Sequence, residues 1–120
     1  MSKKTLVLGA SLNPSRYSHM AIERLRTHGH EVVAIGLKPG FVSDVAIVTG
    51  TPFVTGIDTV TMYMRAERQK PLYDYILSLH PERIIFNPGA ENPELEKLAQ
   101  EKGISVMEAC TLVMLSTGMY

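Results

Sequence analysis

Two short apolar runs near the start of the chain each stop at a glycine, and one helical segment separates them. The runs cover residues 5–9 and 31–36, and between them Ala21, Ile22 and Leu25 recur at helical spacing. Strand, helix and strand within about 35 residues is the size of a βαβ unit. Continuous apolar runs are typical of parallel strands that are buried on both faces. The opening of the chain therefore predicts a parallel sheet covered by helices.

The same alternation continues along the chain. Pro71 is expected to open a helix, and Asn92 is expected to cap another, with Pro93 at its first position. The stretch 41–56 is the least regular, although 45–48 fits a strand. Further strands are expected at 57–64, 83–87 and 104–107, and helices at 71–79, 93–102 and 109–115. We therefore expect an α/β fold: a single doubly wound, Rossmann-like parallel sheet of about five strands with helices on both faces, forming one domain over residues 1–120.

Length and composition limit the class of protein. The chain has 120 residues, of which 45% are hydrophobic, and it holds one cysteine, Cys110. No apolar run approaches the about 20 residues that cross a bilayer, and the chain enters its first strand too early for a signal peptide. One cysteine forms neither an internal disulfide nor a zinc cluster, which agrees with a reducing compartment. We expect a cytoplasmic protein that associates with no membrane.

The net charge is zero, with 12 Lys+Arg against 12 Asp+Glu, but the charge is unevenly distributed. The balance disfavours nucleic-acid binding. Residues 1–40 carry an excess of +4, whereas residues 81–120 carry −3. The charged residues of the first third are Lys3, Lys4, Arg16, Arg24, Arg26 and Lys38 against Glu23 and Glu31. An anionic ligand is therefore expected to bind through the first third of the chain.

The loop between the first strand and the first helix is the strongest functional signal. Ligands of open α/β sheets bind beyond the carboxyl ends of the strands, and a helix N-terminus there favours a phosphate. The loop does not follow the G-x-G-x-x-G dinucleotide pattern, and an ordinary polar loop is the alternative interpretation. Gly9 allows the turn, and the candidate binding residues that accompany it are Ala10, Ser11, Asn13, Pro14, Arg16 and Ser18.

The end of the second strand bears on the choice of nucleotide. An NAD-binding domain usually has an acidic residue there to bind the ribose hydroxyls, whereas this chain has Leu37, Lys38 and Pro39. A lysine attracts a phosphate, so coenzyme A or NADP, which carry a phosphorylated ribose, fit Lys38 better than NAD does. The alternative is a solvated surface lysine.

Two more loops are expected at the same edge of the sheet. Met64 ends the strand expected at 57–64 and Arg65 follows it, and Arg65 could contact pyrophosphate oxygens. Asn87 and Gly89 follow the next strand, where the glycine lets a ligand approach the backbone. These four residues complete the candidate binding set.

The sequence predicts no catalytic residue and no metal site. His19 is the best-placed imidazole, but the spacing specifies no acidic partner or nucleophile for it, and Cys110 lies in an apolar setting that is typical of an inert thiol. We therefore expect a binding role rather than an enzyme.

The candidate loop resembles a known family. Gly9-Ala10-Ser11, Asn13-Pro14, Arg16 and Ser18 match the G-A-S-x-N-P-x-R-x-S opening of the small stand-alone CoA-binding proteins, relatives of the CoA-binding domain of the succinyl-CoA synthetase alpha subunit. Weaker matches follow in the same order along nearly the whole chain, at Ile57-Asp58, Pro71, Gly89, Asn92 and 106–110. Leu37-Lys38-Pro39 replaces the usual Val-Asn-Pro, and 41–56 is shorter than in relatives.

This resemblance implies a Rossmann-like fold that binds CoA or an acyl-CoA over the first glycine loop. Ligase activity does not transfer, because the phosphorylated histidine of the synthetases lies in a further domain. The expected partner is thus a nucleotide-type small molecule, and a protein partner or a homo-oligomer stays open. Two alternatives are a small NADP-dependent oxidoreductase and a protein-interaction module that binds no nucleotide.

Overall fold

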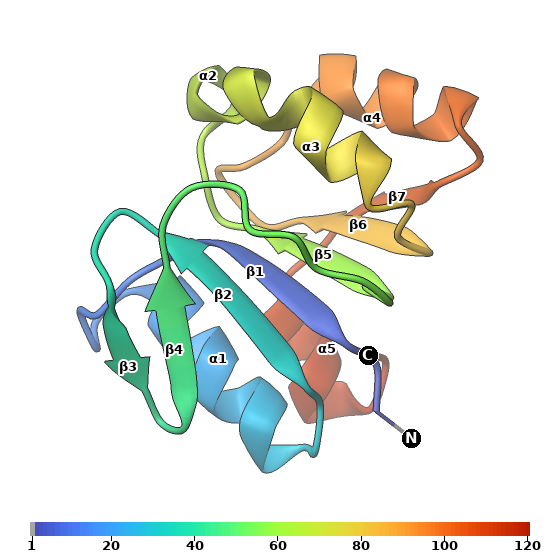
Figure 1. Ribbon diagram of the computed structural model, residues 1–120. Coiled ribbons are helices and arrows are strands. Elements are labelled where there is room, and N and C mark those ends of the chain that lie inside the picture. Colours follow the sequence, from blue (N-terminus) through green and yellow to red (C-terminus); the bar gives the residue numbers. More distant parts are fainter. Residues whose placement is uncertain (1) are drawn as a thin grey trace.

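The computed structural model describes residues 2–120, which form a seven-stranded sheet between two layers of helices (Figure 1). The sheet order is β3-β4-β2-β1-β5-β6-β7. The strands are β1 (Thr5–Ala10), β2 (Val32–Gly36), β3 (Gly40–Val42), β4 (Val45–Val48), β5 (Thr59–Met62), β6 (Arg83–Phe86) and β7 (Ser105–Glu108). The helices are α1 (Tyr17–Thr27), α2 (Ala66–Gln69), the 3₁₀ turn η1 (Lys70–Leu72), α3 (Tyr73–Ser78), α4 (Pro93–Glu101) and α5 (Thr111–Thr117).

All neighbouring strands are parallel except β3, which pairs antiparallel with β4 at the edge of the sheet. The predicted doubly wound, Rossmann-like α/β fold is confirmed. The expected number of about five strands was too low, since the β3–β4 hairpin extends the sheet. Its two-residue turn places Ser43 at φ 56, a left-handed conformation that the sequence alone did not indicate.

The two faces of the sheet bury separate hydrophobic cores. Side chains alternate along β1, so that Leu6 and Leu8 pack beneath α3 and α4, whereas Val7 packs against α1 and α5. In Figure 1, α1 and α5 lie on one face of the sheet and α2, α3 and α4 on the other. Both faces of the central strands are covered, which explains why the parallel strands appear as continuous apolar runs.

The helix expected to begin at Pro71 begins five residues earlier, at Ala66. Residues 66–69 form one α-helical turn, and Pro71 lies within the 3₁₀ turn that leads into α3. A proline is tolerated there because it lies at the beginning of the 3₁₀ turn, where a backbone N–H group would have no partner within that turn. The prediction of the start was therefore wrong, although a helical segment does connect β5 and β6.

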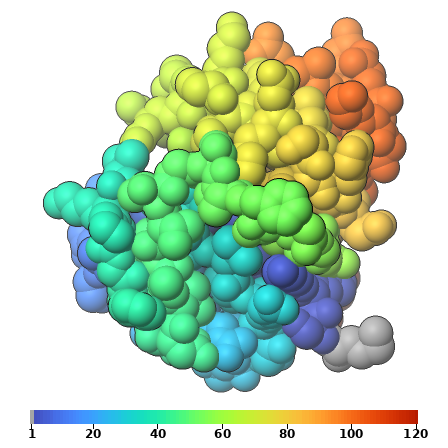
Figure 2. Space-filling view, viewed as in Figure 1, coloured from blue at the N-terminus to red at the C-terminus, as the bar shows by residue number. Residues whose placement is uncertain are grey.

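The connection from β4 to β5 contains no helix. Residues 49–58 cross the sheet as an extended segment, shown in green across the middle of the space-filling view (Figure 2). The Tyr75 hydroxyl of α3 donates to the Pro52 carbonyl oxygen at 2.8 Å, and Ile57 is buried in the core beneath α3 and α4. This segment leads the chain from one side of β1 to the other.

The last described residue, Tyr120, lies beside the beginning of β1. Lys3 donates through its Nζ to the Tyr120 carbonyl oxygen at 2.7 Å, and the Arg83 guanidinium stacks 4.5 Å from the centre of the Tyr120 ring. The two ends of the chain therefore meet at the amino edge of the sheet (Figure 1). Within residues 2–120, no helix has the length and apolar character needed to span a membrane.

Candidate functional site

The strand order of the sheet reverses at β1, which lies between β2 and β5. In open α/β sheets this is where ligands bind, outside the carboxyl ends of the strands. The loops that follow β1, β2, β5 and β6 all open at this edge, because these strands are parallel. All thirteen residues predicted for the binding site lie in these loops or in the strand and helix ends that flank them.

The backbone at Gly9, near the end of β1, packs closely against the loop after β5. Its φ is +92°, and it lies where the pairing of β1 with β2 shifts register between Leu8 and Ala10. A Cβ at this position would meet Met64 Cγ at 3.0 Å and the carbonyl carbon of Tyr63 at 3.1 Å. A glycine is therefore required here both for its backbone conformation and for the close approach of the loop after β5.

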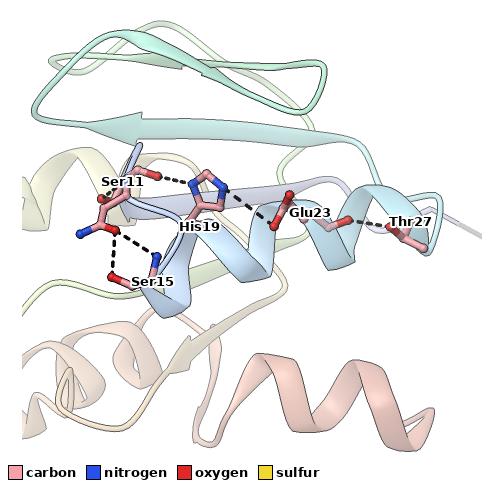
Figure 3. Close-up of polar contacts among 6 residues, drawn as sticks. Ser11, Ser15, His19, Glu23 and Thr27 are labelled. Carbon is pink, nitrogen blue, oxygen red and sulfur yellow. Dashed lines mark hydrogen bonds and ion pairs between the residues drawn. The ribbon is translucent and has the colours of Figure 1, made fainter.

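The segment 11–16 is folded by its own polar groups (Figure 3). Asn13 Oδ1 accepts hydrogen bonds from the backbone N–H and the hydroxyl of Ser15, at 3.0 and 2.8 Å. Ser11 Oγ accepts from the Asn13 N–H at 3.1 Å, and the Asn13 carbonyl accepts from the Arg16 N–H at 3.0 Å. Asn13 thus acts as a turn former, and Pro14 at the tip is exposed.

The N-terminus of α1 has no side-chain cap, and its N-cap residue is Arg16. Several backbone N–H groups here and in the preceding loop make no hydrogen bond within residues 2–120. They belong to Ser11, Leu12, Tyr17, Ser18 and His19. Unpaired N–H groups at a helix N-terminus, where the helix dipole is positive, are suited to bind an anionic oxygen. Ser18 itself is 4% exposed, so its side chain lies against the protein.

The loop after β2 lies against the loop after β1. Gly36 pairs with Ala10 in the sheet, and a Cβ at Gly40 would meet the Leu12 side chain at 2.7 Å. Lys38 and Pro39 lie between these two contact points and are both exposed. The structure therefore brings Lys38 to the same edge of the sheet as the glycine loop.

The predicted cationic residues differ in their surroundings. Arg16 and Lys38 are exposed and make neither an ion pair nor a side-chain hydrogen bond within the described part of the chain. Arg65, by contrast, has its Nε 3.8 Å from a carboxylate oxygen of Glu67, and both side chains are exposed. A contact between such solvated groups is weak and easily exchanged.

Asn87 is a structural residue as well as a predicted one. Its side chain is 2% exposed and donates to Thr61 Oγ1 at 2.7 Å and to the Met62 carbonyl at 2.9 Å. Its Oδ1 accepts from the Thr111 N–H at 2.8 Å. Both amide hydrogens are thus engaged within the protein, and Asn87 fixes the start of α5 to the end of β5. Gly89, two residues further on, has φ +92° and is exposed.

Sequence reasoning missed Gln69, which holds two of the site loops together. Gln69 is fully buried and donates through Nε2 to the Met64 carbonyl at 2.7 Å and to the Ala90 carbonyl at 2.8 Å. Its Oε1 accepts from Asn92 Nδ2 at 2.8 Å. Asn92 in turn caps α4, as predicted, by accepting from the Leu95 N–H at 3.1 Å. This network fixes the loop after β5 against the loop after β6.

Unlike the side chain of Gln69, that of Tyr63 has a buried polar atom that is unpaired. The Tyr63 hydroxyl makes no hydrogen bond within residues 2–120, and burial raises the pKa of this phenol, so it remains protonated.

Within residues 2–120, no group of three His, Cys, Asp or Glu side chains is placed to hold a metal ion. Two open surface hollows, one lined by Asp74 and His80 and the other by Arg26 and Asp44, include none of the candidate residues. The candidate site is therefore an open edge lined by backbone donors.

Comparison with known proteins identifies the family of the chain. A family model described as a CoA binding domain matches residues 3–116. The chain is 27% identical to the YneT protein of Bacillus subtilis (strain 168) over 114 residues, which covers 93% of this chain and 84% of that protein.

Two solved structures are similar over almost their whole length. One, a crystal structure of an uncharacterized protein, is 49% identical, has a TM-score of 0.96, and covers 100% of this chain and 99% of its own. The other, from Thermus thermophilus, is 24% identical with a TM-score of 0.86, covering 99% of this chain and 91% of its own. Because the family model spans nearly every residue and the fold agrees, the chain belongs to the CoA binding domain family.

Proposed function

We propose that this protein binds coenzyme A or an acyl-CoA at the carboxyl edge of its sheet, with the phosphates on the glycine and serine loop, as a binding or sensing module that performs no catalysis. The observation that carries the proposal is the set of unpaired backbone N–H groups of 11–12, in the loop after β1, and of 17–19, at the uncapped start of α1. These donors suit the pyrophosphate of such a ligand. Membership of the CoA binding domain family supports the choice of ligand.

Lys38 would contact the phosphate on the ribose. Lys38 is exposed and makes no ion pair within residues 2–120, and Gly40, two residues further along its loop, lies against Leu12. Arg16, at the N-cap of α1, would contact the pyrophosphate. Met64 and Gly89 would form the neighbouring surface, and Asn87 would act by positioning its loop.

The non-catalytic role is supported by the state of the reactive groups nearby. The His19 ring is engaged with the Ser11 carbonyl oxygen at 3.0 Å, and the buried Tyr63 phenol has a raised pKa. The acyl group of the ligand, a protein partner and self-association are left to experiment.

The test is thermal unfolding with CoA, dephospho-CoA, NADPH and NAD. A ligand present at 100 times its dissociation constant stabilises the fold by about 2.7 kcal/mol. CoA should raise the melting temperature more than dephospho-CoA, which lacks the ribose phosphate, and NAD should have no effect. A rise with NADPH alone would identify a reductase, and no rise with any nucleotide would identify an interaction module; either result would overturn the proposal.

Matched variants assign the contacts. Arg16→Ala should weaken CoA binding about tenfold, which corresponds to about 1.4 kcal/mol, whereas Arg24→Ala, on the exposed face of α1, should not. Lys38→Ala should abolish the preference for CoA over dephospho-CoA, with Lys102→Ala at the end of α4 as its control. Titration calorimetry measures both effects.

A further inference from the structure

His19 makes a contact that no pattern in the sequence indicated. Its Nδ1 lies 3.0 Å from the Ser11 carbonyl oxygen, and its Nε2 lies 3.8 Å from a Glu23 carboxylate oxygen (Figure 3). The imidazole is largely enclosed, with 12% of its side chain exposed, whereas Glu23 is 57% exposed. Because a carbonyl oxygen only accepts hydrogen bonds, Nδ1 must carry the hydrogen.

This bond differs from the others that shape the segment 11–16. The side-chain hydrogen bonds of Ser11 Oγ, Asn13 and Ser15 all begin and end within that segment. Within residues 2–120, His19 provides the one side-chain hydrogen bond to the segment from outside it. The internal bonds fix the shape of the turn, and the His19 bond fixes its orientation relative to α1.

The orientation matters because of the geometry of the Ser11–Leu12 peptide. This peptide bond is trans, so its carbonyl and its N–H point in opposite directions. With the Ser11 carbonyl held by the His19 ring, the Leu12 N–H points away from that ring, and it has no partner within the described residues. Rotation of this peptide would withdraw one of the unpaired donors.

We infer that His19 is a positioning residue for anion binding: its Nδ1–H holds the Ser11–Leu12 peptide so that the Leu12 N–H is presented to a phosphate oxygen of the ligand. The inference deepens the proposed function and rests on it. His19 touches no ligand phosphate itself, and the Glu23 carboxylate, 3.8 Å from Nε2, is not needed for the hydrogen bond to Ser11.

Two isosteric variants separate the hydrogen bond from the bulk of the ring. In His19→Asn the side-chain amide nitrogen lies where Nδ1 was, and the bond to Ser11 can form. In His19→Gln the amide lies near the position of Nε2, and the bond is lost. Titration calorimetry with CoA as the probe should give an affinity for His19→Asn within about threefold of the wild type, and a loss of about tenfold or more for His19→Gln.

Further readouts exclude a merely structural role. The Glu23→Gln variant should keep the wild-type affinity within about threefold, because the donor to Ser11 is intact. ¹⁵N NMR of the ligand-free protein should show the Nδ1–H tautomer, and the Leu12 amide resonance should shift in His19→Gln but not in His19→Asn. The melting temperatures of the ligand-free variants report any general loss of folding.

The outcomes are distinct. Equal CoA affinity in His19→Asn and His19→Gln, or a loss in Glu23→Gln as large as that in His19→Gln, would overturn the role of His19 and leave the proposed function standing. Failure of the wild-type protein to bind CoA would overturn the proposed function together with this inference.

Discussion

Gly36 of β2 faces the backbone of Ala10 in β1 so closely that a Cβ at Gly36 would clash with the Ala10 carbonyl oxygen. No side chain fits between them, because the atoms that it would meet are backbone atoms of Ala10, which the pairing of β1 with β2 holds in place. This contact sets how near the loops after β1 and β2 can lie, and hence how near Lys38 is to the glycine loop.

Gly36→Ala should therefore destabilise the fold by about 3 kcal/mol, since overpacking against backbone is relieved only by separating the strands. Urea unfolding at 25 °C measures the change. Gly40→Ala is the control, because its Cβ would meet the flexible end of Leu12 at 2.7 Å, and it should cost less than about 1 kcal/mol. Equal stability of the wild type and Gly36→Ala would show that the strands can separate at little cost.

Gln69→Met should destabilise the protein by about 3 kcal/mol. Methionine fills a similar volume, but it leaves the Met64 and Ala90 carbonyls and one hydrogen of the Asn92 amide without the partner that Gln69 provides. Urea unfolding of this variant is compared with Gln100→Met, on the exposed face of α4, which should change stability by less than about 0.5 kcal/mol. A Gln69→Met protein as stable as Gln100→Met would mean that water replaces the lost bonds.

His30 should make the fold sensitive to mild acid. Its Nδ1 accepts the Lys3 N–H at 2.9 Å, and its pKa is lowered by burial first and then by His28, Lys3 and Arg83. A pKa below the ordinary value of about 6.5 means that the folded state favours the neutral ring, so this stabilisation is complete above that pH and is lost as the pH falls below it.

The melting temperature of the wild type should therefore fall between pH 7.5 and 5.5, and His30→Asn, which keeps an acceptor for Lys3, should show a smaller fall. His28→Asn at the exposed end of α1 is the matched control. An identical pH dependence in His30→Asn and the wild type would assign the effect to another group.

Glu96→Gln should stabilise the protein at neutral pH. The pKa of Glu96 is raised by burial and by the neighbouring Glu108, while its Oε2 accepts the Asn92 N–H at 3.2 Å. A raised pKa means that the folded state favours the protonated acid: the stabilisation is present below its ordinary value and is lost as the pH rises through the raised one.

Glutamine keeps the acceptor and removes the charge, so the melting temperature of Glu96→Gln should exceed that of the wild type at pH 7 and equal it at pH 4. Glu101→Gln, exposed at the end of α4, should behave like the wild type at both values. A variant that melts lower than the wild type at pH 7 would contradict the proposed repulsion.

The sequence predicted those parts of the fold whose signals are local. The structure confirms that Gly36 ends β2 and that Asn92 followed by Pro93 starts α4, whereas β1 continues one residue beyond Gly9, to Ala10. The start of the helical segment after β5 was placed wrongly at Pro71, because the single turn before it consists of Ala66 and polar residues that could equally occupy a solvated loop. The β3 strand was not predicted, because three residues are too few to show the alternation of apolar and polar side chains that is typical of a strand.

The candidate site was predictable only where one loop carries several functional residue types. Gln69 could not be found, because an isolated glutamine between charged residues is typical of a solvated helix face, and its burial depends on loops more than 20 residues away. The partner of His19 is a backbone carbonyl eight residues earlier, and a carbonyl leaves no trace in the residue types. The roles of the binding residues stay predictions until a ligand is tested.

The contact between Lys3 and the carbonyl of Tyr120 places both ends of the chain at the edge of the sheet opposite the candidate site. A short linker between them would create a circular permutant, with new termini opened in the β3–β4 turn at Ser43 and Asp44, which are exposed. Every site loop and every strand neighbour would be retained in such a protein. Fluorophores or immobilisation tags attached at either present end would likewise lie on the side of the molecule away from the glycine loop.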